Sequence, residues 1–101
     1  MYKKLDESVS VSPQISTDDL PAIAAQGFKS IICNRPDGES ADQTPYAMIE
    51  TAARKAGLPF RNIPVVSGAI TMDDVVAMKQ AIAELPKPIY AYCRSGARCT
   101  N

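Results

Sequence analysis

Segments rich in β-forming residues alternate along this chain with segments whose apolar residues recur at helical spacing. Strands are expected near residues 2–12, 28–33, 59–66 and 89–92, and helices near residues 16–27, 44–57 and 71–85. This alternation is typical of a parallel sheet with helices packed on its faces. A chain of 101 residues can build one core but not two. The sequence therefore predicts a single α/β domain over residues 1–101, with a small, mainly parallel sheet flanked by helices.

The predicted helices begin at recognisable capping residues. Ser16 precedes the acids of the first helix, and Thr44 precedes Pro45, which is expected at the first helical position of the second. Thr71 and Asp74 have the spacing of a capping box at the start of the third. The predicted buried stripes are Leu20, Ile23 and Ala24; Met48, Ile49, Ala52 and Ala53; and Val75, Val76, Met78, Ala81, Ile82 and Leu85.

The first predicted strand has the weakest pattern. Residues 2–12 form either one poor strand or two short pieces, and Pro13 ends them, which indicates a ribbon at the edge of the sheet. Cys33 ends the second strand and is interpreted as a packed core thiol.

A cysteine, Cys93, follows the last predicted strand directly, and Arg98 closes the loop behind it. In a strand–loop–helix unit, inward backbone amides and the helix N-terminus bind anions. The same field favours a thiolate, so we expect Cys93 to be a nucleophile and Arg98 to hold substrate oxygens in its planar fork. The alternative is a buried, inert cysteine at a strand end. The residues expected to bind the anion are Arg94, Ser95, Gly96 and Ala97.

The turn after the second strand, residues 34–39, contributes two further candidates. Loops that leave the carboxyl ends of parallel strands line the ligand crevice. Arg35 and Asp37 are therefore expected to support the site from a neighbouring strand. A solvated polar turn is an equally good interpretation of these residues.

Composition excludes several classes of function. Eleven basic residues balance eleven acidic ones, so neither nucleic acid nor an anionic membrane is expected as a partner. No histidine is present, which removes Cys-His and Ser-His-Asp machinery and most zinc sites, and no metal or cofactor is expected. Three cysteines without framework spacing, and no apolar run in the first twenty residues, predict a cytoplasmic protein.

Four stretches, taken in order, resemble a known family: the phosphatase-like domain of beta-lactamase-hydrolase-like proteins. They are residues 9–15, 34–39, 63–71 and 92–98, and the resemblance covers nearly the whole chain. It implies a fold similar to protein tyrosine and dual-specificity phosphatases. Some relatives are similar to rhodaneses in activity and are fused to a metallo-β-lactamase-like persulfide dioxygenase, which the resemblance suggests as a partner.

Three features depart from the patterns of these relatives. Tyrosine phosphatases place five residues between Cys and Arg, whereas four separate Cys93 from Arg98, the loop size of rhodaneses. Dual-specificity phosphatases carry a general-acid Asp after the third strand, where this chain has Ser67, Gly68 and Ala69. Cys99 occupies a place where relatives usually carry Ser or Thr, and it is interpreted as structural rather than as a resolving thiol.

These departures favour sulfur transfer as the reaction. The Cys93 thiolate would take sulfane sulfur from a small anionic donor and pass it to an acceptor thiol, and the stable leaving anions need no general acid. The first alternative is hydrolysis of a phosphate ester through a phosphocysteine, which a missing acid slows by ~10²–10⁴-fold. The second is a non-catalytic anion-binding or redox-sensing module that uses Cys93 and Cys99.

A helix is expected directly after the Cys93 loop, where it would supply its dipole and cover a face of the sheet. Little chain remains for it before Asn101. We therefore expect the natural protein to continue past Asn101 by at least one helix.

Overall fold

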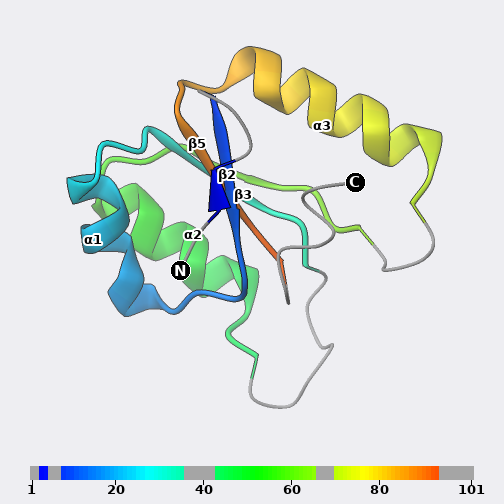
Figure 1. Cartoon of the computed structure of the whole chain (residues 1–101). Coiled ribbons are helices and arrows are strands. Elements are labelled where there is room, and N and C mark those ends of the chain that lie inside the picture. The colour runs from blue at the N-terminus through cyan, green and yellow to red at the C-terminus, as the bar shows by residue number, and fades with distance from the viewer. Residues whose placement is uncertain (1–2, 5–7, 36–42, 66–69, 94–101) are drawn as a thin grey trace.

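The fold is organised around one mixed sheet, seen in a computed structural model that describes residues 3–4, 8–35, 43–65 and 70–93 (Figure 1). Within these residues the strand order is β1-β2-β5-β3-β4. Four strands run parallel, and β1 pairs antiparallel with β2 at one edge. The predicted α/β fold with a mainly parallel sheet is confirmed. The strands are β1 (Lys3–Lys4), β2 (Val9–Ser12), β3 (Ser30–Cys33), β4 (Phe60–Asn62) and β5 (Ile89–Tyr92).

Helices cover both faces of this sheet (Figure 1). The helices are α1 (Leu20–Ala25), preceded by the 3₁₀ turn η1 (Thr17–Asp19), α2 (Tyr46–Lys55) and α3 (Met72–Glu84). One core cluster joins α1 and α2 to the sheet and includes Leu20, Ile31, Ile49 and Tyr92. The other joins α3 to the opposite face and includes Val9, Ile32, Ala81 and Cys93. None of these helices is both long and apolar enough to cross a membrane.

Coverage on both faces explains why β2, β3 and β5 are buried at every position. Successive side chains of β5 enter opposite clusters, so Tyr90 and Tyr92 face α1 and α2 while Ala91 faces α3. The rings of Phe28 and Tyr90 pack edge to face, with centroids 5.0 Å apart and planes at 87°. This alternation directs the residue after Tyr92 to the α3 side of the sheet.

The capping signals of the sequence are largely confirmed. Ser16 begins η1 and Thr71 begins α3, each in a capping box with the Asp three residues later. Thr71 Oγ1 accepts a hydrogen bond from the backbone N–H of Asp74 at 3.2 Å. The second helix begins one residue later than predicted, because Pro45 has extended backbone and is the N-cap itself.

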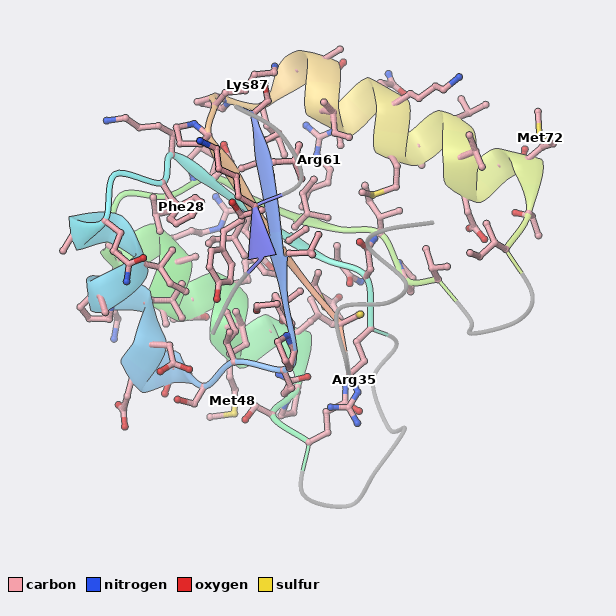
Figure 2. The ribbon with its side chains drawn as sticks, viewed as in Figure 1. Phe28, Arg35, Met48, Arg61, Met72 and Lys87 are labelled. Atoms are coloured by element: carbon pink, nitrogen blue, oxygen red, sulfur yellow. The ribbon has the colours of Figure 1, made fainter. Side chains whose placement is uncertain are left out.

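The prediction that Met48 and Val76 are buried is wrong. Met48 of α2 is 55% exposed and Val76 of α3 is 56% exposed. Figure 2 shows Met48, and also Met72 at the first turn of α3, on the outside of the molecule. The helical stripes are narrower than the periodicity suggested: α2 buries Ile49 and Ala53, and Ala81 is the fully buried residue of α3.

The N-terminal segment forms two short strands, which was one of the two interpretations of its weak pattern. The predicted ribbon at the edge of the sheet is confirmed, because β1 is an edge strand and pairs antiparallel with β2, which in turn pairs with β5. Cys33 is 1% exposed and belongs to the α1/α2-side cluster, so its prediction as a core thiol is confirmed.

Candidate active site

Cys93 lies at the carboxyl end of the central strand. Ser12, Tyr92 and Cys33 are paired in register, so β2, β5 and β3 end at the same level. The backbone N–H of Cys93 donates to Ser12 O at 3.2 Å, which holds the cysteine against the end of β2. On the other side, the N–H of Asn34 donates to Tyr92 O at 2.9 Å. Cys93 is thus fixed between two neighbouring strand ends.

The Cys93 side chain is fully buried in the α3-side cluster. Burial fits a nucleophile at the base of a loop and an inert core cysteine equally well. Most of the other predicted site residues lie outside the described residues: Asp37, Arg94, Ser95, Gly96, Ala97, Arg98 and Cys99. The structure therefore places Cys93 and Arg35 of the predicted set.

Arg35 is a buried cation at the carboxyl end of the parallel strands, the end at which β5 leads into Cys93 (Figure 2). It follows β3 by two residues and is 4% exposed. Its Nη1 donates to Gln14 Oε1 at 3.0 Å, and its backbone oxygen accepts a hydrogen bond from the Cys33 thiol at 3.3 Å. Arg35 is therefore buried and not part of a solvated polar turn, and the strand that it follows, β3, pairs with β5.

Asn34 is a polar residue of this edge that sequence reasoning missed. It is 1% exposed, and its Nδ2 donates to Ile63 O at 2.9 Å and to Met78 Sδ at 3.2 Å. Its backbone oxygen accepts from the N–H of Val65 at 2.9 Å. Asn34 therefore ties the segment after β4 and helix α3 to the strand end beside Cys93.

The Oδ1 atom of Asn34 is buried and has no hydrogen-bond partner among the residues that the structure describes. The burial of Asn34 could have been predicted from its position, since Asn34 is two residues beyond the core residue Ile32 and so points to the same face of the sheet.

Gln14 is a second polar residue that the sequence analysis missed. Its Nε2 donates to Ile15 O at 2.8 Å, so both ends of its amide are engaged.

The described residues contain no group of three His, Cys, Asp or Glu side chains placed to hold a metal ion. What they present at this edge is a thiol, a guanidinium and neutral amides. Such a set can bind an anion and attack it, but the described part of the site holds no group that could act as a general base.

A model of the family described as "Beta-lactamase hydrolase-like protein, phosphatase-like domain" matches residues 1–101. The chain belongs to this family. A beta-lactamase hydrolase-like protein of Agrobacterium fabrum is 39% identical to it over 95 residues, which are 94% of this chain. Those residues make up 22% of that relative, so the chain spans less than a quarter of its length.

Solved structures share the fold of this phosphatase-like domain. A candidate phosphatase from Neisseria meningitidis Z2491 is 41% identical, with a TM-score of 0.90 over 97% of this chain and 70% of that chain. The core catalytic domain of a PP-IP phosphatase from S. cerevisiae has a TM-score of 0.69 over 94% of this chain and 56% of that chain, at 12% identity. The fold is of the tyrosine and dual-specificity phosphatase type, as predicted. The comparisons favour the phosphate-ester alternative over sulfur transfer.

Proposed function

We propose that this domain hydrolyses phosphate monoesters through a phosphocysteine formed on Cys93. The observation that carries the proposal is the position of Cys93 at the carboxyl end of the central parallel strand, between the ends of β2 and β3. In parallel α/β sheets this edge lines the ligand crevice. The 41% identical candidate phosphatase and the family's phosphatase-like description support the same assignment.

The reaction runs in two displacements at phosphorus. The Cys93 thiolate attacks, an S–P bond forms, and the P–O bond to the leaving group breaks with its electron pair on oxygen. Water then attacks the phosphocysteine, which releases inorganic phosphate and restores the thiolate. We assign Arg98 to the phosphoryl oxygens, because its fork can donate two parallel hydrogen bonds. We propose that backbone amides stabilise the remaining negative charge of the phosphoryl group. They are those of Arg94, Ser95, Gly96 and Ala97.

The leaving group decides which esters react. Ser67, Gly68 and Ala69 occupy the place of the usual general acid, so an alkoxide would have to leave without a proton. Aryl phosphates, whose leaving groups are less basic, are therefore the expected substrates. We propose that Asp37 and Arg35 support the active site from the turn after β3, and that Cys99 has a structural role. A reducing cytoplasm is the proposed location, since it keeps the nucleophilic thiol reduced.

The test is aryl phosphate hydrolysis by the wild type and three variants. Cys93→Ser should abolish turnover, because a serine hydroxyl stays protonated at neutral pH. Arg98→Ala should raise KM more than it lowers kcat. Arg54→Ala is the matched control, since Arg54 is an exposed residue of α2 paired with Glu50. Acid quenching during turnover should trap one phosphoryl group on the peptide that contains Cys93. Turnover that survives in Cys93→Ser would refute the proposal.

Sulfur transfer is the second candidate, and one observation favours it: four residues separate Cys93 from Arg98, as in rhodaneses. Its partners would be a small anionic sulfur donor, an acceptor thiol and, by family analogy, a persulfide dioxygenase. Intact-mass measurement after thiosulfate treatment separates the candidates. A gain of one sulfur atom that is absent in Cys93→Ser, together with no phosphoryl adduct from aryl phosphate, would select sulfur transfer.

A further inference from the structure

Asn34 and Cys93 occupy matching positions at the ends of neighbouring strands. Ile32 of β3 is paired with Ala91 of β5, and both belong to the cluster on the α3 side of the sheet. Two residues further along each strand the side chains return to the same face, and these residues are Asn34 and Cys93. The backbone N–H of Asn34 donates to Tyr92 O at 2.9 Å, so the pairing of the two strands continues to this level. Neighbouring strands lie about 4.8 Å apart, and Asn34 is therefore the neighbour of Cys93 on this face.

Asn34 also binds the segment that follows β4. Its Nδ2 donates to Ile63 O at 2.9 Å, and its backbone oxygen accepts a hydrogen bond from the N–H of Val65 at 2.9 Å. A second contact of Nδ2, to Met78 Sδ at 3.2 Å, adds helix α3 to this junction. Ile63 and Val65 are buried in the same cluster as Cys93. A single residue thus joins the strand that presents Cys93 to the chain that packs in the same cluster.

The Oδ1 atom of Asn34 is not explained by packing alone. It is buried, and no described residue donates a hydrogen bond to it. Such an acceptor costs folding free energy, which a leucine of nearly the same shape would avoid. Polar groups that are buried at a cost in stability are typical of functional sites. This cost indicates that the amide serves the site and not only the core.

We propose that Asn34 is a positioning residue for the reaction: it fixes the end of β5 against the segment 63–65 and so holds the Cys93 thiol in the geometry from which it attacks. The inference rests on the proposed function, in which Cys93 forms the phosphocysteine. Asn34 does not touch the substrate in this role, so its loss misplaces the nucleophile without removing a binding contact. A misplacement of about 1 Å can reduce a rate by about 100-fold.

The experiment compares two buried polar residues on the same face of β3. Asn34→Leu keeps the volume of the side chain and removes both ends of the amide. Ser30→Ala is the matched control, because Ser30 is fully buried at the opposite end of β3 and its Oγ donates to Pro86 O at 2.5 Å. In Asn34→Leu, kcat for aryl phosphate hydrolysis per folded molecule should fall at least about 10-fold, with KM within about twofold of wild type. Ser30→Ala should lower stability and leave kcat per folded molecule unchanged.

A second measurement does not depend on turnover. Peptide mapping after iodoacetamide treatment gives the alkylation rate of Cys93 in each folded protein. Because Cys93 is fully buried, a strand end that is no longer fixed should expose its thiol. Alkylation should therefore be faster in Asn34→Leu than in wild type or in Ser30→Ala.

A role of Asn34 limited to stability predicts a different result. Equal kcat values per folded molecule in Asn34→Leu and Ser30→Ala, or equal alkylation rates of Cys93, would overturn the inference. If Asn34→Leu fails to fold, Asn34→Ala takes its place in both measurements. A wild type that hydrolyses no aryl phosphate would refute the proposed function, and the alkylation rates would then decide this inference alone.

Discussion

Replacing Asn34 with Asp exchanges a buried amide for a carboxyl group of nearly the same shape. In the wild type, Nδ2 donates to Ile63 O and to Met78 Sδ. A carboxyl group in its place donates one hydrogen bond when protonated and none when ionised, so at least one of these two acceptors loses its donor at every pH. Leaving a buried polar group unsatisfied costs about 1–3 kcal/mol, and that part of the loss does not depend on pH.

A second, larger part depends on pH. Residue 34 is 1% exposed, so burial would raise the pKa of the introduced carboxyl group in the folded state above its unfolded value of about 3.9. Below that value both states are protonated and the extra penalty vanishes. Above it the unfolded state releases its proton first, so folding loses about 1.4 kcal/mol per pH unit up to the folded pKa. A rise of about three units would therefore cost about 4 kcal/mol at neutral pH.

Urea unfolding followed by circular dichroism, from pH 5 to pH 8, measures both parts. Asn34→Asp should lose stability relative to wild type as the pH rises, whereas Asn34→Ala should show a constant deficit. Parallel curves for Asn34→Asp and the wild type across this range would show that the side chain is not buried among these partners, and the description of this edge would be wrong.

Two further predictions concern the helices. Ile49→Ala should cost about 2–5 kcal/mol of unfolding free energy, because Ile49 is fully buried, whereas Met48→Ala on the exposed side of the same helix should change it by less than about 0.5 kcal/mol; equal losses in urea unfolding would contradict the assigned faces. Thr71→Ala should cost about 1 kcal/mol through loss of the α3 cap, and Thr71→Ser should recover most of it. An unchanged midpoint for Thr71→Ala would show that the cap contributes nothing measurable.

Much of the fold was predictable because local signals agree with tertiary packing. Thr71 and Asp74 form the expected capping box, and β5 runs directly into Cys93. The failures arise where packing decides. Met48 and Val76 have the spacing of a buried stripe, but periodicity gives the direction of a helix face and not the width of its contact with the sheet.

The candidate site was predictable only in part, for a related reason. Cys93 became a candidate because it follows a strand and begins a loop that Arg98 closes, and Arg35 because the carboxyl ends of strands in a parallel sheet share one edge. Gln14 and Asn34 were missed because an amide in a turn-rich stretch usually faces water, and its burial depends on partners distant in the sequence. Asn34 binds Ile63 and Met78, 29 and 44 residues away, and no local pattern records those contacts.

The place of β5 in the sheet links folding to chemistry. It is the last strand among the described residues, yet it is inserted between β2 and β3, which do not pair with each other. During synthesis, both neighbours expose unpaired backbone groups until Ile89–Tyr92 leaves the ribosome, and such open edges favour aggregation. The segment that presents Cys93 is thus also the one that closes the sheet. The same four residues therefore both complete the pairing of β2 and β3 and bring Cys93 to the carboxyl end of the sheet.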